Sequence, residues 1–167
     1  YGETIYVLNP APNSLLSAGL HYSLDSGQTW EQSVAEGLTE PPMQIAVHPN
    51  DAGVLALATR AGVFLSNDFG ATFTRISDAN IVTSVAFDPD GERLLFGFDN
   101  LFSYSLSNGQ ITSLAVSPDI DADQAILYIA LNPVDEALAF ATSDRDIYLS
   151  PNGGESWEQI AADGMSN

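Results

Sequence analysis

Short apolar runs alternate along the chain with clusters of glycine, proline, asparagine and aspartate. Between residues 41 and 80, the apolar runs lie at 44–47, 54–59, 63–66 and 71–76, and turn-forming residues separate them. Runs of this length and composition are typical of strands, and no helix-period stretch of ten or more residues with caps interrupts them. This part of the chain is therefore predicted to form four short strands.

The same arrangement returns along the whole chain. An apolar run that ends in Asn, His or Asp followed by proline recurs about every 40 residues, with the prolines at Pro10, Pro49, Pro89 and Pro133. We assign this run to the first strand of each repeat, and in the last repeat we favour residues 126–131 because Pro133 keeps the period. The second strands of the other three repeats are expected at residues 14–18, 93–98 and 137–142.

A second motif runs in phase with the prolines. Its full form, Ser-x-Asp-x-Gly-x-Thr-Trp, occupies residues 23–30, and residues 66–73 differ only in the aromatic. Residues 150–157 replace the aspartate by asparagine, and a decayed third copy keeps only Ser105 and Gly109. Two markers with one period predict four repeats of four strands, which is the size of a β-propeller blade. The expected single domain, 1–167, has blades near 1–40, 41–80, 81–122 and 123–167.

The octad is suited to a turn between the third and fourth strands. Its acidic side chain accepts backbone hydrogen bonds, its glycine takes a positive φ, and its aromatic wedges against a neighbouring sheet. Because catalysis rarely needs the same acid in several blades, we assign structural roles to these residues. They are Ser23, Asp25, Gly27, Thr29, Trp30, Ser66, Asp68, Gly70, Thr72, Phe73, Ser105, Gly109, Ser150, Asn152, Gly154 and Trp157.

These octads resemble the Asp-box, or BNR, repeat of sialidase-like β-propellers, and the resemblance covers essentially the whole chain. It implies an all-β propeller built from four Asp-box blades of four antiparallel strands. Familiar propellers of this kind have more than four blades, so a four-bladed ring, a part of a larger ring and half of an eight-bladed ring all stay open. The families that carry the repeat include sialidases, xyloglucan-degrading glycosidases, sortilin-type receptors and photosystem II assembly factors.

Charge narrows the classes of partner. The chain has 22 Asp and Glu residues against four arginines and no lysine, which gives a formal net charge of −18. It cannot build the basic face that nucleic acids or anionic membrane surfaces require. No apolar run reaches the ~18 residues of a membrane-spanning helix, so we expect no membrane insertion. The absence of cysteine excludes disulfides and thiolate metal sites. The start at Tyr1, without a signal sequence, suggests a processed precursor, and the resemblance to Asp-box proteins implies an extracytoplasmic location.

The arginines bear on catalysis. Sialidases of this type clamp the substrate carboxylate with three arginines, for which the bidentate guanidinium is suited. Arg60 and Arg145 fall in equivalent turns between the second and third strands, on the face where propellers usually bind ligands, whereas Arg93 and Arg75 lie elsewhere. At most two arginines converge, so the clamp is not supported. Arg60 and Arg145 stay candidate ligand contacts, with surface pairing to nearby acids as the alternative.

No cofactor or metal site stands out. Asp119, Asp121 and Asp123 form the densest acidic cluster and could offer oxygen ligands to Ca²⁺, but the EF-hand spacing is absent, so we interpret the cluster as a solvated loop. His21 and His48 lie in non-equivalent positions, and no third zinc ligand can be named.

The decayed third octad and the missing arginine clamp favour a non-enzymatic, extracytoplasmic module that binds a protein partner. Such a module would serve as a scaffold, subunit or assembly factor of a larger complex, or as a homodimer, without a cofactor. The alternative is a glycan-binding or glycoside hydrolase-like domain. Glycan binding that is lost on replacement of Arg60 or Arg145 would favour it.

Overall fold

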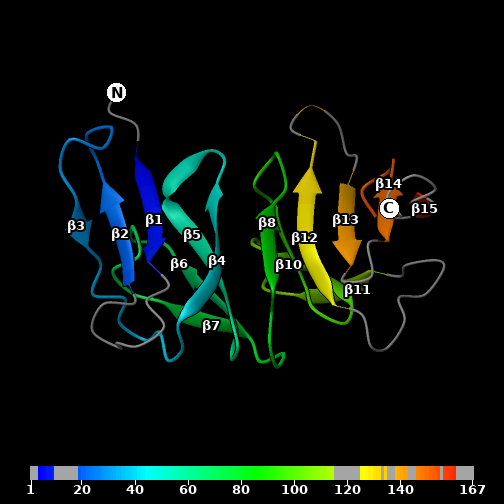
Figure 1. Ribbon diagram of the computed structural model, residues 1–167, viewed down its shortest axis with the longest axis horizontal. Coiled ribbons are helices and arrows are strands. Elements are labelled where there is room, and N and C mark those ends of the chain that lie inside the picture. Colours follow the sequence, from blue (N-terminus) through cyan, green and yellow to red (C-terminus); the bar gives the residue numbers. More distant parts are fainter. Residues whose placement is uncertain are drawn as a thin grey trace, which may run out of the picture. The chain divides into compact units, whose positions relative to one another are not determined.

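The computed structural model describes residues 4–9, 19–114, 125–132, 134, 138–142, 146–154 and 156–160, with the side chains of 138–142 left out. In these residues fifteen strands form four antiparallel sheets (Figure 1). The all-β prediction is therefore confirmed. The chain divides into two compact units, Tyr1–Ile81 and Val82–Asn167, and each unit contains two of the sheets.

The first unit contains a three-stranded and a four-stranded sheet. The three-stranded sheet consists of β1 (Ile5–Asn9), β2 (Gly19–Ser23) and β3 (Glu31–Gln32). The four-stranded sheet consists of β4 (Pro42–His48), β5 (Asp51–Thr59), β6 (Gly62–Ser66) and β7 (Thr74–Ser77). In both sheets the strands lie side by side in chain order, as in a meander.

The second unit repeats the plan. One sheet consists of β8 (Ser84–Phe87), β9 (Arg93–Gly97), β10 (Leu101–Ser105) and β11 (Ile111–Leu114). The other consists of β12 (Ile126–Leu131), β13 (Leu138–Thr142), β14 (Ile147–Ser150) and β15 (Glu158–Ile160). The favoured first strand of the last repeat, 126–131, is confirmed by β12.

The first sheet differs from the prediction. Ile5 of β1 stands opposite Ser23, the serine of the first octad, just as Leu55 of β5 stands opposite Ser66. β1 thus takes the place of a second strand, and its assignment as a first strand was wrong. The expected second strand at 14–18 lies outside the described residues. A proline after an apolar run marks the end of a strand, but it does not indicate which position that strand has in its sheet. This explains the error.

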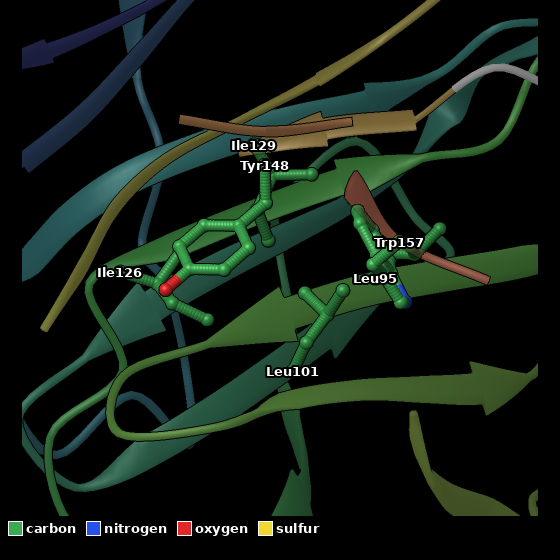
Figure 2. Packing of buried hydrophobic residues seen from close by; sticks show 6 residues of the cluster. All are labelled: Leu95, Leu101, Ile126, Ile129, Tyr148 and Trp157. Atoms are coloured by element: carbon green, nitrogen blue, oxygen red, sulfur yellow. The ribbon is translucent and has the colours of Figure 1, made fainter. Parts of the chain in front are cut away.

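Each unit has an apolar core between its two sheets. In the first unit Leu20 of β2 packs with Leu55, Leu57 and Phe64 of the neighbouring sheet, and Phe73 of the second octad joins them. In the second unit Leu95 and Leu101 pack with Ile126, Ile129, Tyr148 and Trp157 (Figure 2). In both units the aromatic of the octad therefore lies against the sheet that precedes its own.

Polar contacts also fasten adjacent sheets. The Thr83 hydroxyl donates to the carbonyls of Gly97 and Ile126, and the Ser84 hydroxyl accepts the Ile129 N–H at 3.0 Å. In the first unit the chain leaving β3 pairs with the second octad: Glu36 N–H donates to Ala71 O at 3.0 Å, and Phe73 N–H donates to Glu36 O at 2.7 Å.

Candidate functional site

The second octad closes on itself through its serine and aspartate. Ser66 is buried; its hydroxyl donates to Asp68 Oδ1 at 2.8 Å and accepts the Gly70 N–H at 2.9 Å. Asp68 in turn accepts the N–H and the hydroxyl of Thr72 at 2.9 and 2.6 Å. Phe69 and Gly70 both have positive φ, at 59° and 83°, and this turns the chain between β6 and β7.

The first and fourth octads have the same hydrogen bonds. Ser23 and Ser150 each accept the N–H of the octad glycine at 2.8 Å. Asn152, which stands where the others have aspartate, accepts from the N–H and hydroxyl of Ser156 through its one carbonyl oxygen, at 3.0 and 3.2 Å. One oxygen therefore suffices to close the turn. In the two aspartate octads, by contrast, the N–H and the hydroxyl of the threonine bind different carboxylate oxygens.

These hydrogen bonds set the electrostatics of the octad acids. The N–H and hydroxyl of Thr29, together with Ser23, lower the pKa of Asp25 to about 2, and the Thr72 hydroxyl and N–H lower the pKa of Asp68 in the same way. A glycosidase general acid needs the opposite shift, because it must hold a proton near neutral pH. Both acids are therefore bound within their own turns, and neither has the raised pKa of a general acid.

The third repeat closes with a different turn. Ser105 N–H donates to Gln110 O and Gly109 N–H donates to Ser105 O, both at 2.9 Å, while the Ser105 hydroxyl meets only Ser107, at 3.1 Å. This is an ordinary tight hairpin. The assignment of Ser105 and Gly109 to an Asp-box turn is corrected accordingly.

Strand register explains why the third repeat lacks the Asp-box turn. Leu55 and Leu94 occupy matching places, each opposite the residue that precedes a proline corner. Leu55 faces Ser66 across the sheet, but Leu94 faces Tyr104. The turn before β10 has one residue more than the turn before β6, since Gly97 pairs with Leu101 whereas Thr59 pairs with Gly62. The extra residue moves Ser105 to the opposite face of the sheet.

The loop end of the first unit carries the candidate ligand residue Arg60. Arg60 lies in the turn between β5 and β6, where the Thr59 hydroxyl donates to Gly62 O at 2.9 Å and accepts the Ala61 N–H at 3.0 Å. The turn is thus held rigidly, and its arginine is exposed. Among the described residues the Arg60 guanidinium has no hydrogen bond or ion pair.

A shallow groove in the first unit lies along the connection into β4. It has a volume of about 160 Å³ and is formed by the connection from β3 to β4. Because Pro42 pairs with Thr59, this connection enters the sheet beside the Arg60 turn. Its lining residues combine apolar and hydrogen-bonding groups: Val34, Ala35, Leu38, Thr39, Glu40, Pro41 and Pro42. Sequence reasoning missed this groove, because the connection carries no motif beyond its two prolines.

The structure describes only some of the remaining candidates. Arg145 and the cluster of Asp119, Asp121 and Asp123 lie outside the described residues. Arg93 begins β9, at the opposite end of a sheet from a second-to-third strand turn, and its Nε donates to buried Asp88 at 3.0 Å. Arg75 lies in the outer strand β7, where its Nε donates to Ser77 O at 3.2 Å.

Within the described part of the chain, no three His, Cys, Asp or Glu side chains gather as metal ligands. His48 lies at the proline corner, where its Nδ1 accepts the Asn50 N–H at 3.2 Å, so it serves the turn. No described helix is long and apolar enough to cross a membrane.

Known structures share this fold. The chain superposes on an ancestral GH74 enzyme with a TM-score of 0.77 and 15% identity, covering 97% of this chain and 23% of that one. The GH74 enzyme of Niastella koreensis matches with a TM-score of 0.65 and 16% identity, over 85% of this chain and 26% of that one. The architecture is therefore that of part of a GH74 propeller.

Another structure and one sequence add to this picture. The extracellular domain of BT4673 from B. thetaiotaomicron, named as a one-component system, matches with a TM-score of 0.71 and 20% identity, over 97% of this chain and 21% of that one. A xyloglucanase of Hypocrea jecorina is 35% identical over 71 residues, which are 40% of this chain and 8% of that enzyme. No family model matches the chain. The chain thus spans about a quarter or less of the proteins that it resembles.

Proposed function

We propose that this chain is a segment of an extracellular β-propeller that binds a neutral polysaccharide of the xyloglucan class. The observation that carries the proposal is the 35% identity to a xyloglucanase over 71 residues, together with a fold shared with GH74 enzymes. Of the two functions that the sequence left open, the glycan-related one has this support. The extracellular location of the matched BT4673 domain agrees with it.

Charge favours a neutral glycan. A chain with a net charge of −18 repels uronic and sialic acids at long range but exerts no such force on a neutral β-glucan. Arg60 supplies hydrogen-bond donors for sugar hydroxyls, and no carboxylate among the described residues pairs with it. The groove along the connection into β4 adds the exposed apolar surfaces of Val34 and Pro41, against which a sugar ring can pack.

We assign binding, not hydrolysis, to this segment. Glycoside hydrolysis requires two carboxyl groups about 5–10 Å apart, one of them with a raised pKa. The octad acids Asp25 and Asp68 have lowered pKa values and are occupied by their own turns. Asp88 is buried and paired with Arg93. These three acids are thus engaged in contacts that hold the fold.

Affinity electrophoresis in gels containing xyloglucan tests the proposal, with polygalacturonate as the anionic control. The wild-type chain should be retarded only by xyloglucan. Arg60→Ala should weaken binding about tenfold, which corresponds to a lost charge-assisted hydrogen bond. Arg75→Ala removes the same charge from an outer strand and should leave retardation unchanged.

Two results would contradict the proposal. Equal retardation by xyloglucan and by an inert gel would remove the binding function. Release of reducing sugar from xyloglucan by the purified chain would instead contradict the assignment of binding without hydrolysis. It would still support xyloglucan as the ligand.

A further inference from the structure

The backbone of Ile81 takes a conformation that its residue type disfavours. Its φ is 59°, in the left-handed region, where the branched side chain of an isoleucine crowds the backbone. The other described non-glycine residues with positive φ are Ser26, Ala35 and Phe69, and none of them is β-branched. A strained backbone of this kind persists only where surrounding contacts hold it, and it concentrates at binding sites. The contacts of Ile81 therefore indicate where such a site lies.

Ile81 is held by the turn that carries Arg60. The Ile81 N–H donates to the Arg60 carbonyl at 3.0 Å. This bond fastens the segment that follows β7 to the turn between β5 and β6, and Asn80 is its neighbour in the chain. Arg60 and Asn80 are both exposed. The fold of the first unit thus brings a second polar residue, distant in the sequence, to the end of the sheet where Arg60 lies.

Further contacts hold the backbone of both segments. The Ser77 carbonyl at the end of β7 lies so close to Gly62, the residue that ends the Arg60 turn, that there is no room for a Cβ there. The hydroxyl of buried Ser77 accepts the Ala79 N–H at 3.3 Å, which holds the start of the segment that leads to Asn80. A ligand that contacts both segments would therefore lose little affinity to the ordering of their backbone.

The side chain of Asn80 differs in its engagement from an asparagine of the second unit. Asn100 lies in the turn before β10, where its Oδ1 accepts the Leu101 N–H at 2.8 Å and its amide donates to the Ser113 hydroxyl at 3.0 Å. Both polar groups of Asn100 thus serve the fold. Among the described residues, by contrast, none forms a hydrogen bond with the side chain of Asn80. Its carbonyl oxygen and its amide are both left for a ligand.

We propose that Asn80 is a second binding residue of the Arg60 site, and that the two side chains bind adjacent hydroxyl groups of one sugar. This role rests on the proposed binding of a neutral polysaccharide. A hydroxyl both donates and accepts hydrogen bonds, whereas a guanidinium only donates. Asn80 supplies the acceptor that Arg60 lacks. Asp78, exposed on the same segment, adds a negative charge that disfavours sugars with a carboxylate. The pair therefore suits a neutral sugar with neighbouring hydroxyls.

Affinity electrophoresis in xyloglucan gels tests the role of Asn80. Asn80→Ala should weaken binding about tenfold, as expected for lost hydrogen bonds to a ligand. Asn67→Ala is the matched control, because it removes the same side chain from an exposed position beyond the other end of β6, and it should bind like the wild type. The double variant Arg60→Ala/Asn80→Ala should lose less than the product of the two single losses, because both residues hold the same sugar.

Urea unfolding separates binding from stability. Asn80→Ala should keep the urea midpoint of the wild type, since its side chain is exposed. If the midpoint falls, Asn80→Asp replaces it as the test, because this variant keeps the size of the side chain. The carboxylate has no N–H to donate and would pair with Arg60, so Asn80→Asp should also weaken binding about tenfold.

The outcomes distinguish the role of Asn80 from the function on which it rests. A wild-type chain that xyloglucan does not retard would overturn both. If xyloglucan retards the wild type and Arg60→Ala weakens this binding, but the Asn80 variants bind like the wild type, then the role of Asn80 alone is overturned. Losses that multiply in the double variant would contradict the binding of one sugar by both residues.

Discussion

Thr29 donates both its backbone N–H and its hydroxyl to the carboxylate of Asp25, at 2.8 and 2.7 Å. These bonds exist in the folded chain alone, and they lower the pKa of Asp25 from 3.8 to about 2. The unfolded chain therefore binds the proton more tightly. The stabilisation is complete above pH 3.8 and is lost as the pH falls toward 2.

Asp25→Asn should remove this pH dependence. Urea midpoints measured between pH 5 and pH 2 should fall more steeply for the wild type than for the variant. The variant should be the less stable protein at pH 5, and the two curves should converge near pH 2. Parallel curves would show that the Asp25 carboxylate has no linkage to folding.

Ser66→Ala should reduce the free energy of unfolding by about 1–2 kcal/mol, because the buried Gly70 N–H loses its acceptor. Ser105→Ala is the matched control. Its exposed hydroxyl meets only Ser107, so the change should cost less than about 0.5 kcal/mol. Urea unfolding measures both, and equal losses would mean that the octad serine is not the closing group.

Gly62 and Gly109 both have positive φ, at 118° and 72°, but their surroundings differ. A Cβ at Gly62 would lie 2.0 Å from Ser77 O, whereas at Gly109 the nearest atom is the Tyr104 hydroxyl oxygen at 3.6 Å. Gly109→Ala should cost about 1–2 kcal/mol for the left-handed backbone alone. Gly62→Ala should exceed the ~3 kcal/mol that most substitutions stay below. Thermal unfolding compares the two.

Trp157→Ala should destabilise the chain by about 3–5 kcal/mol, because it opens a cavity beside Leu95 and Leu101. Trp30→Ala removes the same side chain from a site that is 45% exposed, so it should cost much less. Chemical unfolding at low protein concentration measures this difference. Similar losses would imply that the Trp30 ring is covered in solution.

Much of the fold could be predicted from the sequence, because the turn motifs and the short apolar runs report local structure. Strand order in the first sheet could not. Asn9-Pro10 looks like the other proline corners, but only the pairing of Ile5 with Ser23 reveals which strand precedes it. In the third repeat, the register change after Gly97 comes from a single extra turn residue, which leaves the apparent motif intact.

The candidate site was predictable only in part. Arg60 could be placed because a two-residue turn between apolar runs fixes its position along the chain. The groove depends on how the connection from β3 folds back to β4. Within this connection Ala35 has a φ of 48°, a left-handed conformation that an alanine in the sequence does not predict. Burial of the octad aromatics likewise depends on which sheet lies alongside, a long-range property.

The bridge between Glu36 and Thr72 has a consequence for biosynthesis. The segment that leaves β3 obtains its backbone partners from Ala71 and Phe73, which the ribosome adds more than thirty residues later. Ser33 also donates to the Gly70 carbonyl of that same turn. During translation the exit of the first sheet therefore stays unpaired until the second octad has emerged. In the first unit, the first sheet is therefore completed only after the next repeat has been synthesised.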